Sequence, residues 1–311
     1  MSEFHHVSVL LDECLEGLKI KPDGIYVDGT LGGAGHSSEI AKRLKTGKLI
    51  GIDRDRVALR AASERLAPFS DRVELVHSNF SQIADVLKEL SIDGVDGILL
   101  DLGVSSPQLD DAQRGFSYMA DAPLDMRMNS QDALDAYAVV NTWSQEELKR
   151  ILYTYGEERY APQIASAICR RREHAPICTT FELVDVIRSA MPPAALREKQ
   201  HPAKRSFQAI RIAVNDELGA VEKVMADTVD LLKPGGRLAV ITFHSLEDRI
   251  VKQAMAEAAK GCVCPPNFPV CVCGKKPKVE IITRKPIVAT DAELEANPRS
   301  RSAKLRICQR I

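Results

Sequence analysis

The residues with the clearest chemical potential form a glycine-rich turn, Asp28-Gly29-Thr30-Leu31-Gly32-Gly33-Ala34-Gly35-His36. The turn follows an apolar run at 24–28 and precedes apolar residues at helical spacing, so it joins a strand to a helix. Glycines in such a unit let the backbone approach a ligand where side chains would clash. Asp53 ends the next apolar run, as a carboxylate that binds ribose hydroxyls does. The glycines alone could form a plain tight turn, but together with Asp53 they indicate a site for an adenosine-containing ligand.

The spacing of the glycines separates two such ligands. A nicotinamide dinucleotide site favours G-x-G-x-x-G, which positions a pyrophosphate at the amino end of a helix. The four glycines of this turn do not fit that spacing. The turn also opens with Asp28, whose negative charge suits a sulfonium and an amino group better than a pyrophosphate. We therefore expect S-adenosylmethionine as cofactor, with a nicotinamide-dependent oxidoreductase as the alternative.

A further carboxylate, Asp101, ends the apolar run at 95–101. Ligands of open α/β sheets bind outside the carboxyl ends of the strands, so we expect Asp101 near the site of methyl transfer. A carboxylate that accepts N–H hydrogen bonds from an exocyclic base amine would favour its attack and stabilise the developing positive charge. The alternative is that Asp101 caps its own turn through backbone N–H groups. No covalent cysteine is required, because such an amine attacks the methyl group directly.

An α/β sheet is needed to position these residues. The expected strands are 24–28, 48–53, 73–76, 95–101 and 237–243, with a closing antiparallel hairpin at 278–283 and 304–308. Strands that alternate with helices indicate a parallel, doubly wound sheet. Helical spacing dominates from about 132 to 213, where prolines mark helix ends. We expect a methyltransferase domain in two parts, 1–108 and 214–311, interrupted by a helical substrate-recognition insertion at 109–213.

The composition excludes several classes of protein. The chain has 311 residues, of which 45% are apolar and 27% are charged, as in a packed globular protein. No apolar run approaches the roughly 20 residues that span a bilayer. Residues 1–20 contain four acidic residues and lack the apolar centre of a signal peptide. We therefore expect a cytoplasmic protein with no membrane partner.

Charge is distributed unevenly along the chain. Residues 1–130 contain 14 Lys and Arg against 21 Asp and Glu, whereas residues 275–311 contain ten against four. A basic half beside an acidic half indicates a polyanionic partner, although an ordinary solvated surface would also account for it.

Several longer motifs resemble the bacterial family of 16S rRNA (cytosine-N4) methyltransferases. They are the glycine turn, Ile98 to Asp110, Arg114-Gly115-Phe116-Ser117, Pro123 to Met128, Tyr155-Gly156-Glu157-Glu158-Arg159, and Phe243-His244-Ser245-Leu246-Glu247-Asp248-Arg249. The matches extend from the first strand to Arg301. The resemblance implies a class I (Rossmann-like) S-adenosylmethionine-dependent methyltransferase sheet with an inserted all-helical domain. It also implies N4-methylation of a cytidine in the decoding region (P site) of 16S rRNA.

The resemblance further implies which residues bind the cofactor: Ala34, Gly35, His36, Asp53, Phe80, Asp101 and Gln108. Phe80 follows the third strand, where its ring could cover an adenine face, and plain core packing is the alternative. The implied partner is 16S rRNA, expected within a small ribosomal subunit. A non-enzymatic ribosome-assembly factor is the other interpretation of the basic segments. The oligomeric state is not indicated.

The chain departs from many amino methyltransferases after the fourth strand. Those enzymes have Asp or Asn followed by Pro-Pro-aromatic, whereas this chain has Asp101-Leu102-Gly103-Val104. The Pro-Pro-Asn-Phe at 265–268 is too far along the chain to replace that motif. Asp101 is therefore the first catalytic candidate, and the weaker candidates are Ser105, Ser106 and His244.

Two basic segments, 201–208 and 299–304, are the expected phosphate contacts, because lysine and arginine release counterions on binding RNA. Lys204 and Arg205 could equally form surface ion pairs.

The cysteines fall into two groups. Cys14, Cys169, Cys178 and Cys308 are scattered and expected to be reduced. The other four form two C-x-C pairs, Cys262-Val263-Cys264 and Cys271-Val272-Cys273. Four thiolates could bind zinc, although C-x-x-C is the usual spacing. A reduced loop and a redox-sensitive cluster are the alternatives, and the sequence alone assigns no metal ligand.

Overall fold

Residues 8–265, 270 and 272–311 are described by a computed structural model, in which the chain forms two compact units. The sheet unit combines the chain up to Gly103 with Leu218–Ile311, and the helical unit is Val104–Glu217. The boundaries expected from the sequence, 109 and 213, lie a few residues inside those of the helical unit. In the described part of the chain, no helix is long and apolar enough to cross a membrane.

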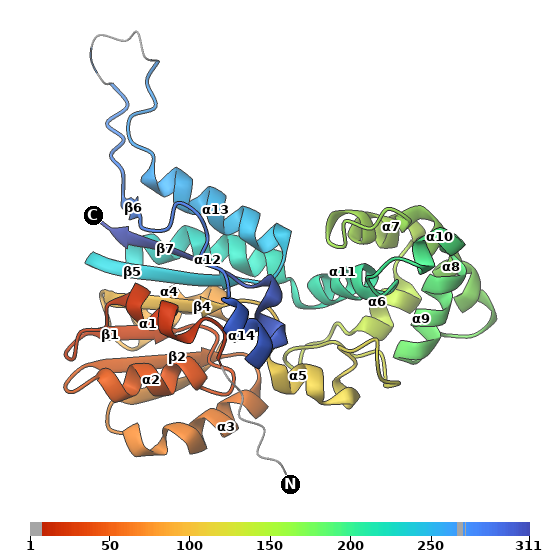
Figure 1. Ribbon diagram of the computed structural model, residues 1–311, viewed down its shortest axis with the longest axis horizontal. Coiled ribbons are helices and arrows are strands. Elements are labelled where there is room, and N and C mark those ends of the chain that lie inside the picture. Colours follow the sequence, from red (N-terminus) through yellow and green to blue (C-terminus); the bar gives the residue numbers. More distant parts are fainter. Residues whose placement is uncertain (1–7, 266–269, 271) are drawn as a thin grey trace. The chain divides into compact units, whose positions relative to one another are not determined.

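A seven-stranded sheet forms the centre of the sheet unit, in the order β3-β2-β1-β4-β5-β7-β6 (Figure 1). The strands are β1 (Ile25–Asp28), β2 (Lys48–Asp53), β3 (Val73–His77), β4 (Val95–Asp101), β5 (Leu232–Thr242), β6 (Val279–Ile281) and β7 (Lys304–Arg310). The first five strands pair in parallel, and β7 is antiparallel to both β5 and β6. The α/β class and the closing hairpin predicted from the sequence are confirmed.

Helices cover both faces of this sheet. They are α1 (Leu11–Leu18), α2 (Gly35–Arg43), α3 (Arg56–Leu66), α4 (Ile83–Glu89), α12 (Glu217–Leu231), α13 (Ser245–Ala259) and α14 (Asp291–Ala296). Alternate strand residues face opposite cores: Ile98 packs with α4, α12 and α13, whereas Leu99 packs with α1, α2 and α3. Both sides of the strands are therefore buried, which explains why they are continuous apolar runs in the sequence.

One strand begins earlier than the sequence predicts. The strand expected at 237–243 begins at Leu232, and Lys233-Pro234-Gly235-Gly236 lie within β5 without a partner in β4 or β7. The pairing of β4 with β5 shifts register between Val95 and Gly97, so β5 contains an irregularity at this point. Gly235 has a φ of 78°, a conformation that glycine adopts without strain.

The helical unit has its own apolar core. Its helices are α5 (Ser106–Asp110), α6 (Ala136–Thr142), α7 (Gln145–Thr154), α8 (Ala161–His174), α9 (Thr180–Ser189), α10 (Pro193–Leu196) and α11 (Lys204–Asn215). Buried residues such as Leu148, Ile164 and Ile210 pack in one cluster. Buried Asn215 accepts the Met128 N–H at 2.8 Å and donates to the Met126 carbonyl at 2.8 Å, which fixes the segment before α6 on α11.

Candidate functional site

Three aspartates end neighbouring parallel strands of the sheet unit. Asp28 ends β1, Asp53 ends β2 and Asp101 ends β4. Because β1 pairs in parallel with both β2 and β4, these carboxylates share one edge of the sheet. Burial raises the pKa of each carboxylate, to about 6 for Asp28 and Asp53 and to about 8 for Asp101. The edge therefore concentrates negative charge that water does not fully solvate.

The side chain of Asp28 stabilises the glycine turn through hydrogen bonds. It is buried, accepts the Ser37 hydroxyl at 2.7 Å and accepts the Thr30 backbone N–H at 3.1 Å. Thr30 in turn accepts the backbone N–H of Asp101 through its Oγ1 at 2.6 Å. Asp28, which was expected to suit a sulfonium, thus accepts hydrogen bonds from the turn itself. Its charge still acts on the site, because Asp28 is one of the causes of the raised pKa of Asp101.

Asp53 connects the turn to β2. One carboxylate oxygen accepts the Gly32 N–H at 2.8 Å, and the other accepts the Asp55 N–H at 2.8 Å. Each oxygen has a second lone pair, so the side chain can still accept hydrogen bonds from two neighbouring hydroxyls. This is the hydrogen-bonding capacity that a ribose requires.

The glycines of the turn serve different purposes. A Cβ on Gly35 would lie 1.9 Å from the Ser8 hydroxyl oxygen, and one on Gly29 would lie 2.6 Å from Leu100, so packing within the protein requires both. A Cβ on Gly33 would meet nothing within 4 Å, and its φ is not left-handed. No contact in the described residues requires glycine there, whereas close approach of a ligand would.

Ala34 and His36 continue the turn into α2. Ala34 is buried, has a left-handed φ of 58° and precedes the first residue of the helix. Its N–H donates to the Leu31 carbonyl at 2.8 Å, which closes the turn. The ring of His36 is buried, with Nε2 2.9 Å from the Val9 carbonyl oxygen and Nδ1 3.9 Å from Asp101 Oδ2.

Asp101 differs from the other two aspartates because one of its oxygens is unsatisfied. Oδ1 is buried and has no hydrogen-bond partner in the described residues, although the side chain as a whole is 25% exposed. Desolvation is the largest cause of its raised pKa, followed by the charges of Asp28 and Glu247. A buried acceptor without a partner is costly. A ligand that brings an N–H donor or a positive charge would remove that cost.

Phe80 begins the short helix Phe80–Gln82 after β3 and lies against the same turn. A Cβ on Gly29 would lie 3.2 Å from the Phe80 Cβ, and the ring is only partly buried against the core. Both sequence interpretations, core packing and cover for a ligand, are compatible with this position.

The remaining site candidates have structural contacts. In the helical unit, Gln108 accepts the Ser105 N–H at 3.0 Å, so the two residues form a capping box at the start of α5. Ser106 is the first residue of α5, and its side chain lies outside the described part of the structure. In the sheet unit, His244 caps α13, and its Nδ1 accepts the Glu247 N–H at 3.4 Å. The buried Nε2 of His244 lies 3.2 Å from Glu247 Oε1 but, like Asp101 Oδ1, makes no hydrogen bond in the described residues. Asp101 remains the first catalytic candidate of the sheet unit because it ends a strand beside Asp28 and Asp53.

Three residues that shape this site, Thr30, Ser37 and Glu247, were not predicted from the sequence as site residues. Glu247 is buried and accepts the Phe243 N–H at 2.9 Å, which places its charge behind Asp101. Hydroxyl and carboxylate residues near a turn are too common in sequences to be assigned such contacts. The only indication of the site in the sequence was that three expected strands each end in an aspartate.

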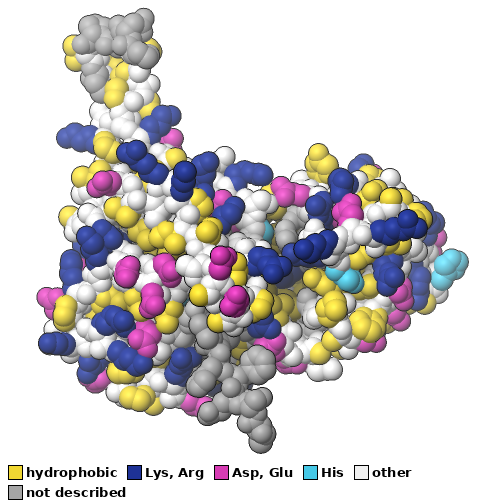
Figure 2. Space-filling model, in the orientation of Figure 1, with side chains coloured by type: hydrophobic (Ala, Val, Ile, Leu, Met, Phe, Trp, Pro, Cys, Tyr) yellow, Lys and Arg dark blue, Asp and Glu magenta, His cyan; other side chains and the backbone are white. Residues whose placement is uncertain are grey.

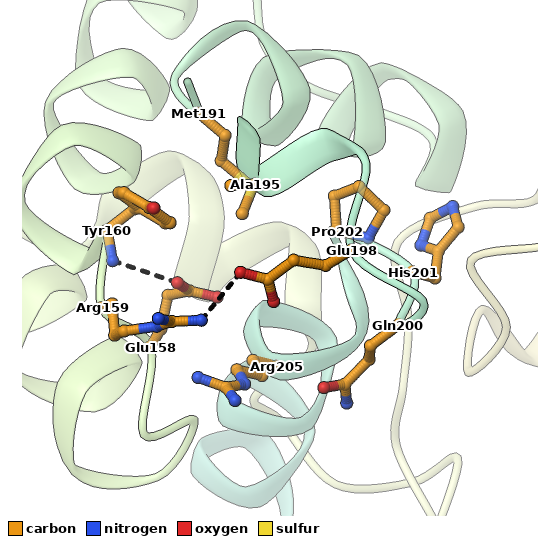
Figure 3. Close-up of a pocket in the computed structure, with 10 residues that line it drawn as sticks. All are labelled: Glu158, Arg159, Tyr160, Met191, Ala195, Glu198, Gln200, His201, Pro202 and Arg205. Atoms are coloured by element: carbon orange, nitrogen blue, oxygen red, sulfur yellow. Dashed lines mark hydrogen bonds and ion pairs between the residues drawn. The ribbon is translucent and has the colours of Figure 1, made fainter. Parts of the chain in front are cut away.

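A pocket in the helical unit is lined by residues of the segment before α8 and of the α10–α11 region (Figure 3). Arg159 pairs with Glu198 across it at 2.9 Å. His201 stacks on Tyr118, with ring centroids 4.5 Å apart and an interplanar angle of 13°. Burial, with a smaller contribution from Arg188, holds the pKa of His201 below its ordinary value, so the ring is neutral at pH 7. The pocket is thus aromatic on one side and charge-balanced on the other.

The expected phosphate contacts of the segment 201–208 are only partly at the surface. Lys204 is exposed, whereas Ser206 and Phe207 are buried in α11. Gln208 donates to the Tyr155 carbonyl at 3.0 Å, and Arg205 donates to the Glu157 carbonyl at 3.0 Å. Near the carboxyl end of the chain, Arg301 is exposed and Lys304 pairs with Asp248 at 3.3 Å.

The strand order, the glycine turn and the acidic strand ends together define a class I methyltransferase fold. Comparison with known proteins gives the same class. The model of the MraW methylase family matches residues 3–311, and the chain belongs to that family.

Curated relatives cover nearly the whole chain. The protein named Ribosomal RNA small subunit methyltransferase H from Brevibacillus brevis is 58% identical over 309 residues, 99% of this chain and 98% of its own length. The protein of the same name from Heliobacterium modesticaldum is 58% identical over 310 residues, 99% of both chains. That from Heliobacterium mobile is 57% identical over 311 residues, 99% of this chain and 100% of its own. The predicted family, and with it S-adenosylmethionine as the cofactor, is confirmed.

We expect Gly33→Ala to weaken S-adenosylmethionine binding about tenfold, on the order of 1.4 kcal/mol, while leaving the unfolding midpoint unchanged. In the free protein, the added methyl group lies in open space. In the complex, it would occupy space that the ligand needs. Calorimetric titration and thermal unfolding measure the two effects.

Gly235→Ala is the matched control for this substitution. It places a methyl in open space at a left-handed φ of 78°, at the opposite edge of the sheet. It should cost roughly 1–2 kcal/mol of stability and leave cofactor binding intact. Equal cofactor affinity of Gly33→Ala and the parent protein would show that Gly33 does not face the ligand.

The pH dependence of cofactor binding should report Asp101. Its pKa is about 8 without ligand, so the carboxyl is mostly protonated at pH 7. The positive charge of the cofactor favours the ionised form and lowers that pKa. Binding at pH 7 should therefore release about one proton from this carboxyl, and affinity should rise with pH until about 8.

Asp101→Asn isolates this contribution from the titration of the cofactor's own amino group. Calorimetry in buffers of different ionisation enthalpy counts the protons. The proton release of the parent protein should exceed that of Asp101→Asn at pH 7. The same count for both proteins would mean that the cofactor charge does not act on Asp101.

Proposed function

We propose that the protein transfers a methyl group from S-adenosylmethionine to N4 of a cytidine in the decoding region (P site) of 16S rRNA. The observation that carries this proposal is the buried, unsatisfied oxygen of Asp101 at the end of β4. The names of the curated relatives, which extend over the whole chain, support the choice of rRNA as substrate.

The residues of the sheet edge fit a cationic methyl donor. Gly33 leaves room for close approach, Asp53 retains lone pairs for ribose hydroxyls, and the excess negative charge attracts a positive ligand. A pyrophosphate would be repelled by the same charge, which counts against a nicotinamide cofactor. When bound, S-adenosylmethionine supplies an electrophilic methyl group on a positively charged sulfur.

Asp101 would act on the acceptor amine. The lone pair of an exocyclic base amine is delocalised into the ring, so the amine is a weak nucleophile. An ionised Asp101 that accepts an N–H hydrogen bond turns the amine toward a pyramidal, nucleophilic geometry. As the N–C bond forms and the C–S bond breaks, nitrogen becomes positive and loses a proton. Once the sulfur is neutral, the positive charge that lowered the pKa of Asp101 is gone and burial again favours the protonated carboxyl, so Asp101 would take that proton.

The helical unit is the proposed contact for the rRNA. Single-stranded RNA is recognised by stacking on aromatic rings and by contacts to phosphates. The helical unit offers both kinds of group: the rings of Tyr118 and His201 are stacked, and exposed Lys204 follows His201 by three residues in the chain. Figure 2 shows many Lys and Arg side chains on the face of the helical unit in view.

A deletion strain tests the reaction and the residue together. Nucleoside mass spectrometry of its 16S rRNA should show loss of the N4-methylated cytidine, restored by the parent gene. Asp101→Asn should restore less than about 1% of the methylation rate, in keeping with the loss of a general base. A deletion strain with unchanged N4-methylcytidine would refute the function. Full restoration by Asp101→Asn would remove only Asp101 from the mechanism.

The same assay separates an enzyme from an assembly factor. Transfer of labelled methyl groups should be measured on naked 16S rRNA and on small subunits from the deletion strain. Incorporation into either substrate supports an enzyme, and the proposal expects the subunit to be the better substrate. Binding to subunits without any incorporation would favour the assembly factor.

Lys204→Ala should weaken rRNA binding equally for all sequences and reduce the slope of log affinity against log salt by about one. Filter binding across a salt series measures the slope. Lys149→Ala is the control, because Lys149 belongs to the same unit but is paired with Glu146 at 3.2 Å. Equal slopes for the two variants would exclude Lys204 as a phosphate contact. S-adenosylmethionine binding should not change in either variant.

A further inference from the structure

The segment between α13 and β6 has no core of its own. In its described residues, from Lys260 to Lys278, there is no helix or strand, and the chain projects away from the sheet (Figure 1). Three valines are exposed to solvent: Val263 by 49%, Val270 by 69% and Val272 by 74%. A connection of this length without secondary structure is uncommon in a compact domain unless it has a function. We call these residues the cysteine loop.

Three cysteine sulfurs of the loop nevertheless converge. The Sγ atoms of Cys262, Cys264 and Cys273 all lie within 4.8 Å of one another, and those of Cys262 and Cys273 are 3.7 Å apart. A disulfide would bring two sulfurs to about 2.0 Å. Thiolates at about 2.3 Å from a tetrahedral zinc ion lie roughly 3.8 Å from one another. The observed spacing matches ligands around a metal ion rather than a covalent pair.

Each of these sulfurs also accepts a backbone N–H. Cys264 N donates to Cys262 Sγ at 3.4 Å, and Val263 N donates to Cys273 Sγ at 3.5 Å. Val272 N donates to Cys264 Sγ at 3.4 Å. A thiol sulfur is a weak acceptor, whereas a thiolate is stabilised by such bonds. The backbone of the loop is thus folded around three sulfurs in the way that suits their ionised form.

The charge of the loop has the matching sign. Residues 260–278 contain four lysines and no aspartate or glutamate. Three thiolates around a divalent cation have a net charge of about −1, which nearby lysines offset. Two carboxylates outside the loop pair with its lysines in the described residues: Glu257 of α13 pairs with Lys260 and Lys275, and Asp230 of α12 pairs with Lys278.

We propose that Cys262, Cys264 and Cys273 bind a zinc ion, which holds the cysteine loop in place of an apolar core. Three soft thiolates select zinc over the hard cations that prefer oxygen ligands. Cys271, the remaining member of the two C-x-C pairs, lies outside the described residues. The site belongs to the sheet unit but lies on a different segment from the strand ends that bind the cofactor, so its role is to order the loop.

The full-length protein, purified in the presence of a reductant, tests the site directly. Mass spectrometry of metals should find about one zinc per chain. After removal of the zinc with an organomercurial reagent, Co²⁺ should bind with the intense near-ultraviolet absorption of sulfur-to-cobalt charge transfer. The absence of zinc, or a cobalt spectrum without that absorption, would overturn the proposal.

Substitutions assign the ligands. Cys262→Ser, Cys264→Ser and Cys273→Ser should each reduce zinc content at least tenfold under dialysis against a weak chelator. Cys178→Ser, an exposed cysteine of the helical unit, should leave it unchanged. Zinc retained by all three loop variants, or lost from Cys178→Ser, would contradict the assignment.

Two further measurements separate a metal from the alternatives. Amide hydrogen exchange of Val263 and Val272 should become faster on zinc removal, while that of the β4 strand should not change. A folded β4 in the variants also shows that loss of metal is not loss of fold. A stoichiometric disulfide within the loop of the protein purified in the presence of a reductant, or exchange rates that do not respond to zinc, would refute the site.

Discussion

The parallel pairing of β1 with β2 and β4 is the constraint on which the site depends. Parallel neighbours bring their carboxyl ends to the same edge, so three strands that each end in aspartate must bring three acids together. Helices on both faces keep water from most of these side chains. The protein therefore holds carboxylates whose ionised forms are destabilised, which is visible in the raised pKa of Asp28, Asp53 and Asp101.

The three aspartates differ in their hydrogen-bond partners, and so in their roles. Asp28 and Asp53 accept backbone N–H groups of the turn, at Thr30 and Gly32, and so fix its shape. Asp101 receives no such bond at Oδ1, and its own backbone N–H donates to Thr30. Two acids thus act as internal ligands, while the third keeps an oxygen for something that the protein alone does not supply. All three aspartates end a strand, but they differ chemically because their hydrogen-bond partners differ.

Much of this arrangement could be predicted from the sequence, because it follows from periodicity. Apolar runs and the glycine turn located the strands, and each strand-ending aspartate then had to lie at one edge. The contacts that distinguish the acids could not be predicted. Ser37 and Glu247 lie nine and 146 residues from the aspartates that they act on, and nothing local marks them. The start of β5 shows the same limit: Leu232 pairs with Val95 ahead of the strand expected from 237, while the Pro-Gly-Gly sequence between Leu232 and Arg237 has no partner in β4 or β7.

The connection after β4 explains why the chain can lack the Pro-Pro-aromatic motif found in many amino methyltransferases. Leu102 donates its N–H to the Ile241 carbonyl at 3.0 Å, so the end of β4 stays paired with β5 one residue beyond Asp101. Gly103 then turns the backbone with a φ of 97°, and the chain passes directly into the helical unit at Val104. A rigid motif that holds the base is not present at this point. The segment that follows Asp101 is instead the start of an entire unit. If that unit binds rRNA as proposed, binding energy from a large RNA surface would position the acceptor amine.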